Sequence, residues 1–275
     1  MSSFVTSEGK ENVQELSEKR GNMYFRQSYT EKMPNYYYDG SFDGLLTVIY
    51  MAYEDRKSKA LRVSSETEQL ILEFDDIHIM TDFSKARRVE KNICEKLSQD
   101  FLNKMRTCFL SCYKNKDTII VHTVYKALKQ GEEILNSLDE HAFRMNRLIK
   151  QVLSERHKYL GVLRFREMKD GTMFSTIEPK NNVLPALISH FRNRMKKEKF
   201  AIFDKEREMI AYYDTEKVEI FFVKSPEIEW SDEEMEYSEL WKTFHKSISI
   251  KERENKKLQQ SNLPKYYWQH LVEDM

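Results

Sequence analysis

Three apolar runs follow one another in the stretch Lys199-Phe-Ala-Ile-Phe-Asp-Lys-Glu-Arg-Glu-Met-Ile-Ala-Tyr-Tyr-Asp-Thr-Glu-Lys-Val-Glu-Ile-Phe-Phe-Val223. The runs 199–204, 209–213 and 218–223 are rich in aromatic and β-branched residues, and short polar segments separate them. Runs of this length and composition are typical of β-strands joined by tight connections. The stretch therefore predicts three consecutive strands of one sheet.

A further hairpin is predicted upstream of these strands. The segments 159–166 and 172–177 flank the turn Lys169-Asp-Gly171. A turn that contains Asp-Gly is typical of the connection between antiparallel strands. Downstream of the sheet, we expect a helix over 235–250 and a final helix that begins near Pro264.

A helix is also predicted between the hairpin and the three strands. We expect Asn182 to cap it and Met195 to lie at its end, and Pro185 falls in the first turn, where a missing backbone N–H does little harm. Such a helix start, directly after a strand, can hold an anion through its free N–H groups. Helix capping alone would also explain this segment.

The chain begins with the polar residues 1–34, which predict a flexible extension. The aromatic run Asn35–Tyr38 predicts a strand, Asp39-Gly40 predicts a turn, and Ser41 predicts the cap of a helix. A second short strand is expected around 77–79.

Apolar residues then recur every three or four positions from Ala86 to Cys112, which predicts one long helix capped by Thr81 or Asp82. Shorter helical patterns follow over 118–130 and 141–156. Helices segregated from hairpin-forming strands define the α+β class. We expect a single α+β domain over 35–275, with an antiparallel, hairpin-rich sheet and a mainly helical subdomain, 82–158, between strands.

The sequence lacks several motifs that carry well-known chemistry. It contains no GxxxxGK[ST], no GxGxxG, no HExxH and no CxxxCxxC pattern, so it offers none of the usual cradles for nucleotide phosphates, catalytic zinc or a radical-SAM cluster. The seven histidines are scattered singly. We therefore expect no metal and no cofactor.

The three cysteines, Cys94, Cys108 and Cys112, fall on the apolar stripe of the predicted long helix, and small buried hydrophobes in a reducing compartment are the favoured interpretation. No apolar segment is long enough to cross a membrane, and the first residues do not resemble a signal peptide. We expect a cytoplasmic protein that does not associate with membranes.

Charge is balanced overall and uneven locally. The chain has 45 basic and 45 acidic residues, yet 160–200 carries nine Lys and Arg against four acids, and 242–265 carries seven against two. Each segment thus has a net charge of +5, and Glu227–Glu239 between them has seven acids and no base. Solvated helix surface explains most such runs, but cations neutralise phosphates and aromatic rings stack on exposed bases.

Basic residues and aromatic residues are therefore the candidates for a nucleic-acid interface. Arg164 and Arg166 would share one strand face, although ion pairing with Glu167 or Glu178 is the structural alternative. The rings of the C-terminal run could equally be core anchors. The full set of candidate contacts is Arg164, Arg166, Arg192, Arg194, Arg253, Lys256, Lys257, Lys265, Tyr267 and Trp268.

Two other functions remain open from the sequence. Glu178, Asn182 and His190 lie near one strand–helix junction and offer acid and base groups for an enzyme that acts on a nucleobase or modified nucleotide. A pure protein-interaction subunit is the other alternative, in which the acidic run 227–239 docks a basic partner and the aromatic residues bury in the interface.

Three separated blocks of the sequence form a recognisable pattern. They are Tyr38-Asp-Gly-Ser-Phe-Asp-Gly-Leu-Leu-Thr47; Leu163-Arg-Phe-Arg-Glu167 with Ile177-Glu-Pro-Lys-Asn-Asn-Val-Leu-Pro185 and His190-Phe191; and Leu240-Trp-Lys-Thr-Phe-His-Lys-Ser-Ile-Ser-Ile-Lys-Glu-Arg-Glu-Asn255 with Leu263-Pro-Lys-Tyr-Tyr-Trp268. Together these blocks resemble a bacterial family associated with DNA repair or DNA metabolism. The resemblance covers roughly 36–273. Leu263 replaces an expected Met, and Tyr266 replaces an expected basic residue.

The resemblance implies a biological setting and supplies no catalytic residues. Members of that family are genomic companions of a radical-SAM protein related to photoproduct lyases, and longer members carry a uracil-DNA-glycosylase-like domain after this one, which the present sequence lacks. The resemblance therefore implies an accessory protein that positions DNA for a radical-SAM partner enzyme.

Overall fold

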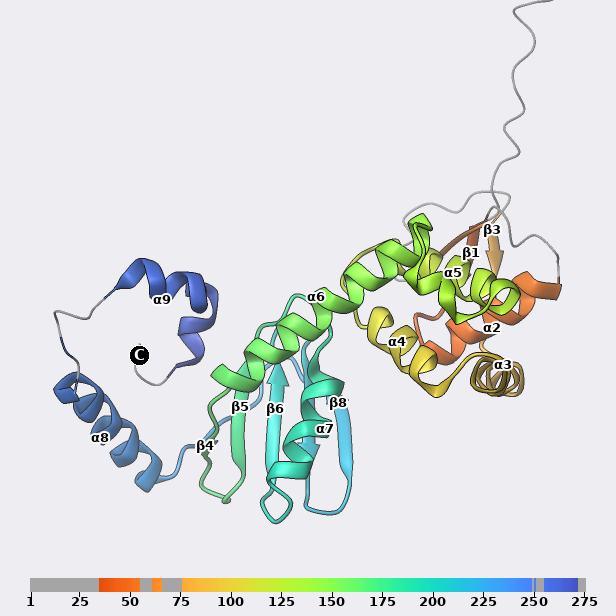
Figure 1. Ribbon diagram of the computed structural model, residues 1–275. Helices are drawn as coiled ribbons and strands as arrows, with labels where there is room; N and C mark the ends of the chain where they lie inside the picture. Colours follow the sequence, from red (N-terminus) through yellow and green to blue (C-terminus); the bar gives the residue numbers. More distant parts are fainter. Residues whose placement is uncertain (1–34, 55–60, 66–75, 249, 251–254, 272–275) are drawn as a thin grey trace, which may run out of the picture.

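The chain places its strands in two separate sheets joined by one long helix (Figure 1). The computed structural model describes residues 35–54, 61–65, 76–248, 250 and 255–271. The predicted N-terminal extension, 1–34, lies outside the described residues. No helix in the described part of the chain has the length and apolar character that crossing a membrane would require.

The first sheet is parallel throughout its described strands. β1 (Asn35–Tyr38) lies between β2 (Arg62–Ser65) and β3 (Asp76–His78), and both neighbours run parallel to it. A parallel neighbour needs a crossover connection, and α2 (Phe42–Glu54) supplies it between β1 and β2. The predicted cap of α2 is confirmed, because Ser41 Oγ accepts the Gly44 N–H at 2.9 Å.

Four further helices pack beside this sheet: α3 (Phe83–Lys96), α4 (Gln99–Phe109), α5 (Lys116–Gln130) and the short 3-10 helix η2 (Glu132–Asn136). Together with α2, β1 and the first part of α6 they enclose the first apolar core. The prediction of one helix through 82–112 is wrong in one respect. Asp82 does cap α3, but the chain leaves the helix at Leu97, and Ser98 Oγ starts α4 by accepting the Phe101 N–H at 3.0 Å.

The 23-residue helix α6 (Glu140–Val162) connects the two halves of the molecule (Figure 1). At 1.5 Å per residue it is about 35 Å long. Met145 and Leu148 belong to the first core, whereas Val152 and Tyr159 belong to the second, which lies under the other sheet. The prediction of a strand from Tyr159 is therefore wrong, because Tyr159 continues the buried stripe of α6 at helical spacing.

The second sheet has five strands in the order β4-β5-β6-β7-β8, with β4 (Arg166–Glu167), β5 (Met173–Ile177), β6 (Phe200–Asp204), β7 (Met209–Tyr213) and β8 (Val218–Phe222). β4 and β5 form the predicted hairpin, and β6, β7 and β8 run antiparallel in succession. The pair β5 and β6 is parallel, so the sheet is mixed rather than wholly antiparallel. The α+β class is confirmed, and the antiparallel description holds only for part of the sheet.

Helix α7 (Leu184–Arg194) makes the crossover between the parallel strands β5 and β6 and lies on the same face of the sheet as α6 (Figure 1). Leu187, Ile188 and Phe191 bury against the second core. The predicted Asn182 cap is wrong, because the helix starts after Val183, which makes no side-chain cap. The Asn182 N–H donates instead to Leu110 O at 2.8 Å, which ties the start of α7 to the end of α4.

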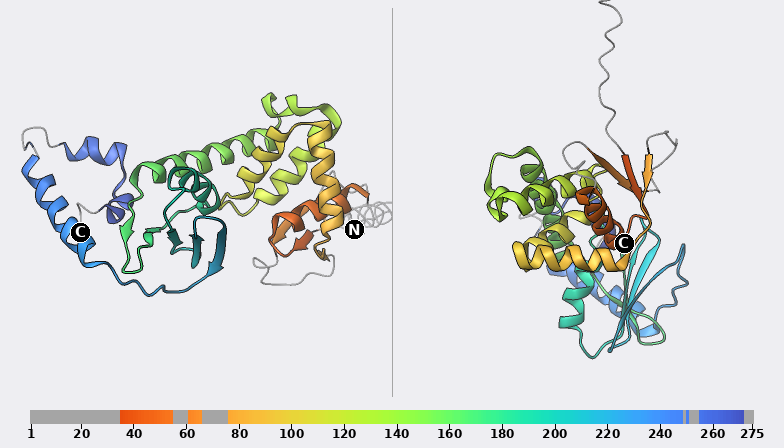
Figure 2. Two further views of the ribbon diagram at one scale, coloured as in Figure 1. Left: turned by 90° about the horizontal axis from the view of Figure 1, so that it is seen from below. Right: turned by 90° about the vertical axis from the view of Figure 1, so that its right-hand side faces the viewer.

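The C-terminal segment extends away from the sheet and returns to α6 (Figures 1 and 2). It comprises α8 (Asp232–Ile248), α9 (Lys256–Asn262) and the 3-10 helix η4 (Lys265–His270). η4 replaces the predicted final helix, and Tyr267 on it packs edge-on against Tyr159 with ring centroids 5.1 Å apart. The segment is thus anchored at both ends and exposed along α8.

Candidate functional site

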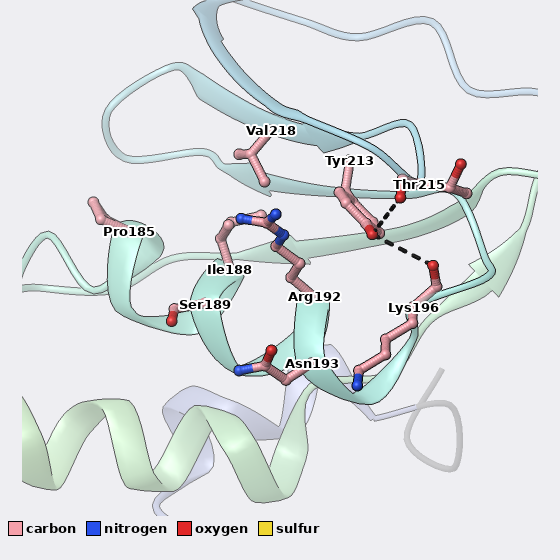
Figure 3. Close-up of a pocket in the computed structure, with 9 residues that line it drawn as sticks. All are labelled: Pro185, Ile188, Ser189, Arg192, Asn193, Lys196, Tyr213, Thr215 and Val218. Atoms are coloured by element: carbon pink, nitrogen blue, oxygen red, sulfur yellow. Dashed lines mark hydrogen bonds between the residues drawn. The ribbon is translucent and has the colours of Figure 1, made fainter.

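Helix α7 and the turn between β7 and β8 enclose a hollow of about 600 Å³ (Figure 3). The helix contributes residues three or four positions apart, which form a stripe beside its buried face. The strands contribute the residues around their connecting turn. The complete lining is Pro185, Ile188, Ser189, Arg192, Asn193, Lys196, Tyr213, Thr215 and Val218.

Tyr213 fixes the geometry of this hollow. Its hydroxyl donates to the Thr215 carbonyl at 2.6 Å and lies 3.4 Å from the Lys196 carbonyl (Figure 3). Thr215 has a φ of 87°, a left-handed conformation that is costly for a β-branched residue. The hydrogen bond from Tyr213 helps to hold this strained turn against the end of α7.

Arg192 points into the hollow, whereas two neighbouring polar groups point away from the strands. The Arg192 guanidinium lies 6.0 Å from the centre of the Tyr213 ring and reaches toward Val218 (Figure 3). The Lys196 ammonium and the Asn193 amide extend on the side that faces away from the strands (Figure 3). An anion could therefore meet nitrogen donors both within the hollow and at its rim.

Exposed cations gather at the end of α7 and in the connection to β6. Among the described residues, no carboxylate lies within 4 Å of their side-chain nitrogens and no side-chain hydrogen bond engages them. Glu198 is the acid within this stretch of sequence. We call this set the α7 cationic cluster: Arg192, Arg194, Lys196, Lys197 and Lys199.

Other cations of the second sheet already have carboxylate partners. Lys205 pairs with Glu178 at 2.8 Å, and Arg207 pairs with Asp204 at 3.1 Å. Part of the α7 cationic cluster has a structural explanation, because Arg192 and Arg194 lie in the last turn, where cations stabilise the negative end of the helix dipole. Lys196, Lys197 and Lys199 lie beyond the helix, so their exposure there is not explained by a place in its last turn.

Arg164 and Arg166 do not share a cationic strand face. Arg164 Nη1 donates to Gly161 O at 3.0 Å and so caps the end of α6. Arg166 pairs with Glu234, and its guanidinium carbon lies 4.0 Å from the centre of the Trp230 ring. Arg166 therefore forms an ion pair, as the structural alternative holds, but its partner is Glu234 on α8 and not Glu167 or Glu178.

The second cationic run of the sequence lies apart from the first. Arg253 falls outside the described residues, and Lys256, Lys257 and Lys265 are exposed on α9 and η4. Figure 1 and the left view of Figure 2 show α9 and α7 separated by α6 and the β4 edge of the sheet. The two runs therefore do not lie side by side on one surface.

The two predicted stacking rings serve the packing of η4. Tyr267 is only 6% exposed and lies in the second core, where burial raises its pKa to about 12. Trp268 Nε1 donates to Leu263 O at 2.8 Å. A ring buried as deeply as Tyr267 has no open face for a base, so the core-anchor alternative holds for this residue.

Glu178, Asn182 and His190 do not converge on one point. Glu178 accepts from Lys205, the Asn182 backbone is tied to α4, and the His190 ring stands edge-on to Phe191 at 5.2 Å. None of the three lines the hollow beside α7. Their positions show no pairing of a nucleophile with a base.

A carboxylate of the protein itself binds the backbone N–H groups near the predicted helix start. Glu155 on α6 accepts the backbone N–H groups of Lys180 and Asn181 at 2.8 and 2.9 Å, so these two donors are already satisfied. The sequence did not reveal this contact, because 25 residues separate Glu155 from Lys180.

The hollow itself was also missed from sequence. The charge count over 160–200 includes Lys196, Lys197 and Lys199, yet nothing in the pattern singled them out from other surface lysines. Tyr213 gave no signal, because a strand residue that faces a helix resembles any other core position, and Thr215 lies in the polar turn after the strand. The spacing of Pro185, Ser189 and Arg192 along one helical stripe is the one clue that was present.

The fold and the hollow together describe a two-sheet α+β protein with a cluster of exposed cations beside α7. Residues 114–273, more than half of the chain, match a family described as a domain of unknown function, DUF4130, and the chain belongs to this family. The matched region begins just before α5 and ends after η4. It includes the second and third sequence blocks described above, whereas the first block, 38–47, precedes it. No curated protein matches the chain.

Proposed function

We infer that this protein binds nucleic acid through the α7 cationic cluster and serves as an accessory protein in DNA repair or DNA metabolism. The observation that carries the proposal is the concentration of five exposed cations at the end of α7 and in the connection to β6, within 4 Å of which the described part of the chain places no carboxylate; two of them, Arg192 and Lys196, line the hollow. Phosphate oxygens are the acceptors that such a cluster can satisfy. The chemistry belongs to a radical-SAM partner enzyme, which the resemblance of the three sequence blocks implies.

The geometry fits recognition of a phosphate backbone better than recognition of bases. Arg192 in the last turn of α7 and the lysines that follow the helix offer nitrogen donors, and the buried Tyr267 offers no stacking face. Contacts of this kind position nucleic acid and do not read its sequence. Binding should therefore depend weakly on sequence and strongly on salt.

Fluorescence anisotropy with labelled single-stranded and duplex DNA tests this proposal on the full chain. If all five cations contact phosphate, the slope of log K against log salt is about −4.5 on duplex DNA, so affinity falls about 500-fold between 50 and 200 mM salt. Absence of salt-sensitive binding to either DNA, alone and with the partner enzyme, would refute the proposal.

A second function, docking to the partner protein, is favoured by α8. Its apolar residues recur at helical spacing and remain open to solvent, with Leu240 63% and Trp241 44% exposed. Nearby acids such as Glu233, Glu236 and Glu239 are also exposed. The complete apolar stripe is Tyr237, Leu240, Trp241, Phe244 and Ile248.

An exposed helix face of this kind suits a partner groove that is apolar at its centre and basic at its rim. Calorimetric titration of the purified radical-SAM partner with Trp241→Ser and Phe244→Ser tests the alternative. Loss of binding in these variants, with DNA affinity unchanged, assigns α8 to the partner. Partner binding that both substitutions leave intact removes α8 from that role.

A further inference from the structure

A second hollow lies at the other end of the molecule, between α2, α3 and α5. It has a volume of about 390 Å³, within the range of small-molecule sites. Three tyrosines and three cations contribute to its wall, together with apolar residues of the helices and one carboxylate, Glu54. The tyrosines are Tyr50, Tyr53 and Tyr125, and the cations are Arg88, Lys96 and Lys129.

The rings and cations of this tyrosine hollow already contact one another. Arg88 Nη1 donates to the Tyr50 hydroxyl at 3.1 Å, and its guanidinium carbon lies 5.2 Å from the centre of the Tyr50 ring. Lys129 Nζ lies 4.4 Å from the centre of the Tyr125 ring. These cation–π contacts orient the charges toward the aromatic wall.

One ring is open for stacking. Tyr53 is 57% exposed, and its ring centroid lies 5.7 Å from that of Tyr125, tilted by 53°. An exposed aromatic side chain on an ordered helix leaves apolar surface in contact with water. It forms a platform on which a planar group can stack. Its neighbour Tyr125 limits the space on one side.

The charges around this platform match an anionic ligand. Among the described residues, no carboxylate lies within 4 Å of the side-chain nitrogens of Arg88, Lys96 or Lys129. With Glu54 as the acid in the lining, the wall carries a net charge of +2. A planar ring beside a cationic rim is complementary to one nucleotide, in which a base is attached to a phosphate.

We propose that the tyrosine hollow between α2, α3 and α5 binds a single nucleotide unit. The base stacks on Tyr53, and the phosphate meets Arg88, Lys96 and Lys129. The unit is either a free nucleoside monophosphate or one residue of a single strand, since both present the same base and phosphate. This inference does not rest on the α7 cationic cluster, which lies on the other sheet, and several of its residues precede the region matched to DUF4130.

Two titrations separate the sources of the nucleotide. Calorimetry with nucleoside 5′-monophosphates tests the free ligand on the full chain. Anisotropy with a labelled single-stranded oligonucleotide tests the strand, and it uses the Arg192→Gln/Lys196→Gln background to reduce any contribution of the α7 cationic cluster. Binding in either titration that needs the tyrosine hollow supports the proposal, and comparison of the two identifies the source.

The decisive variants are Tyr53→Leu and Lys129→Gln, both at exposed positions where folding is not at risk. Loss of one stacked ring or one phosphate contact is expected to weaken binding about tenfold. Tyr113→Leu and Lys150→Gln are matched controls outside the hollow and should leave binding unchanged. Failure of the wild-type chain to bind either ligand, or equal binding by Tyr53→Leu and Tyr113→Leu, overturns the proposal. Loss of oligonucleotide binding in the α7 background removes the single strand as a source, and together with no binding of a nucleoside monophosphate it overturns the proposal.

Discussion

The Glu155 carboxylate holds Asn181 at two points. Glu155 Oε2 accepts the Asn181 backbone N–H at 2.9 Å and the side-chain Nδ2 at 2.6 Å. Asn181 Oδ1 in turn accepts the Cys112 N–H at 3.0 Å. One buried carboxylate therefore ties the middle of α6 to the strand–helix connection before α7 and to the chain that leaves α4.

Glu155→Ala should destabilise the protein by about 3 kcal/mol, because it leaves several buried N–H donors without an acceptor. Urea unfolding followed by circular dichroism measures the change. Gln151→Ala, at an exposed position of the same helix, should stay within about 0.5 kcal/mol of the wild type. A loss no larger in Glu155→Ala than in Gln151→Ala would show that this carboxylate does not hold the junction.

The first turn of α8 is attached to the sheet by Glu234. Its two oxygens accept from Arg166 Nε at 3.3 Å and from the Glu167 N–H at 3.2 Å, and both carboxylate and guanidinium are largely buried. Glu234→Ala should therefore release α8 and cost about 1–3 kcal/mol. Limited trypsin digestion should cleave after Lys242 faster than in the wild type, whereas Glu233→Ala is the matched control. Equal digestion rates in the two variants would contradict this role of Glu234.

Two histidines in the first half should make stability sensitive to acid. The rings of His122 and His141 lie 4.5 Å apart, near Lys126 and Asp139, and burial lowers the pKa of both. The folded state thus resists protonation, while the unfolded chain takes up protons near the ordinary histidine pKa of 6.5. Stability should be fully present above pH 6.5 and should fall as the pH drops below it.

Urea unfolding at pH 7.5 and pH 5.5 checks this prediction. The wild type should lose stability at the lower pH, and His141→Gln should lose less because one of the two buried imidazoles is absent. If His141→Gln shows the same decrease as the wild type, the pair is not the origin of the effect.

The three cysteines should react in a fixed order. Burial raises the pKa of the Cys108 thiol to about 12, with the Asp117 carboxylate adding to the effect, whereas Cys112 is exposed and Cys94 is intermediate. Iodoacetamide at pH 8 should label Cys112 first and Cys108 only after unfolding, as mass spectrometry of peptides would show. Since the unfolded chain ionises near the usual thiol pKa of 9.0, this group also lowers stability as the pH rises above 9. Early labelling of Cys108 would contradict its burial.

Local patterns predicted most elements of the fold, because each rests on residues close in sequence. The hairpin around Lys169–Gly171 and the caps at Ser41 and Asp82 depend on contacts within a few residues, and the structure confirms them. The break at Ser98 escaped prediction, since the apolar stripe of 86–112 continues through it with the same period. A serine within such a stripe is compatible with either a continuous helix or a cap.

Features set by distant contacts could not be predicted. The parallel pairing of β5 with β6 follows from where α7 packs, and the strand residues alone carry no direction. Glu155 and Glu234 resemble ordinary surface acids in the sequence, although both bind partners far along the chain. The hollow beside α7 likewise requires Arg192 of the helix and Tyr213 of β7 to lie close together, which no periodicity indicates.

The salt dependence of DNA binding tests the central claim most directly. Neutralising two phosphate contacts with Arg192→Gln/Lys196→Gln should weaken binding and reduce the magnitude of the log K against log salt slope by about 2. The matched variant Lys114→Gln/Lys150→Gln, with exposed lysines in the helical half, should keep the wild-type slope. Equal slopes for the two double variants, or a wild-type chain without salt-sensitive binding, would contradict a role for the α7 cationic cluster in nucleic-acid recognition.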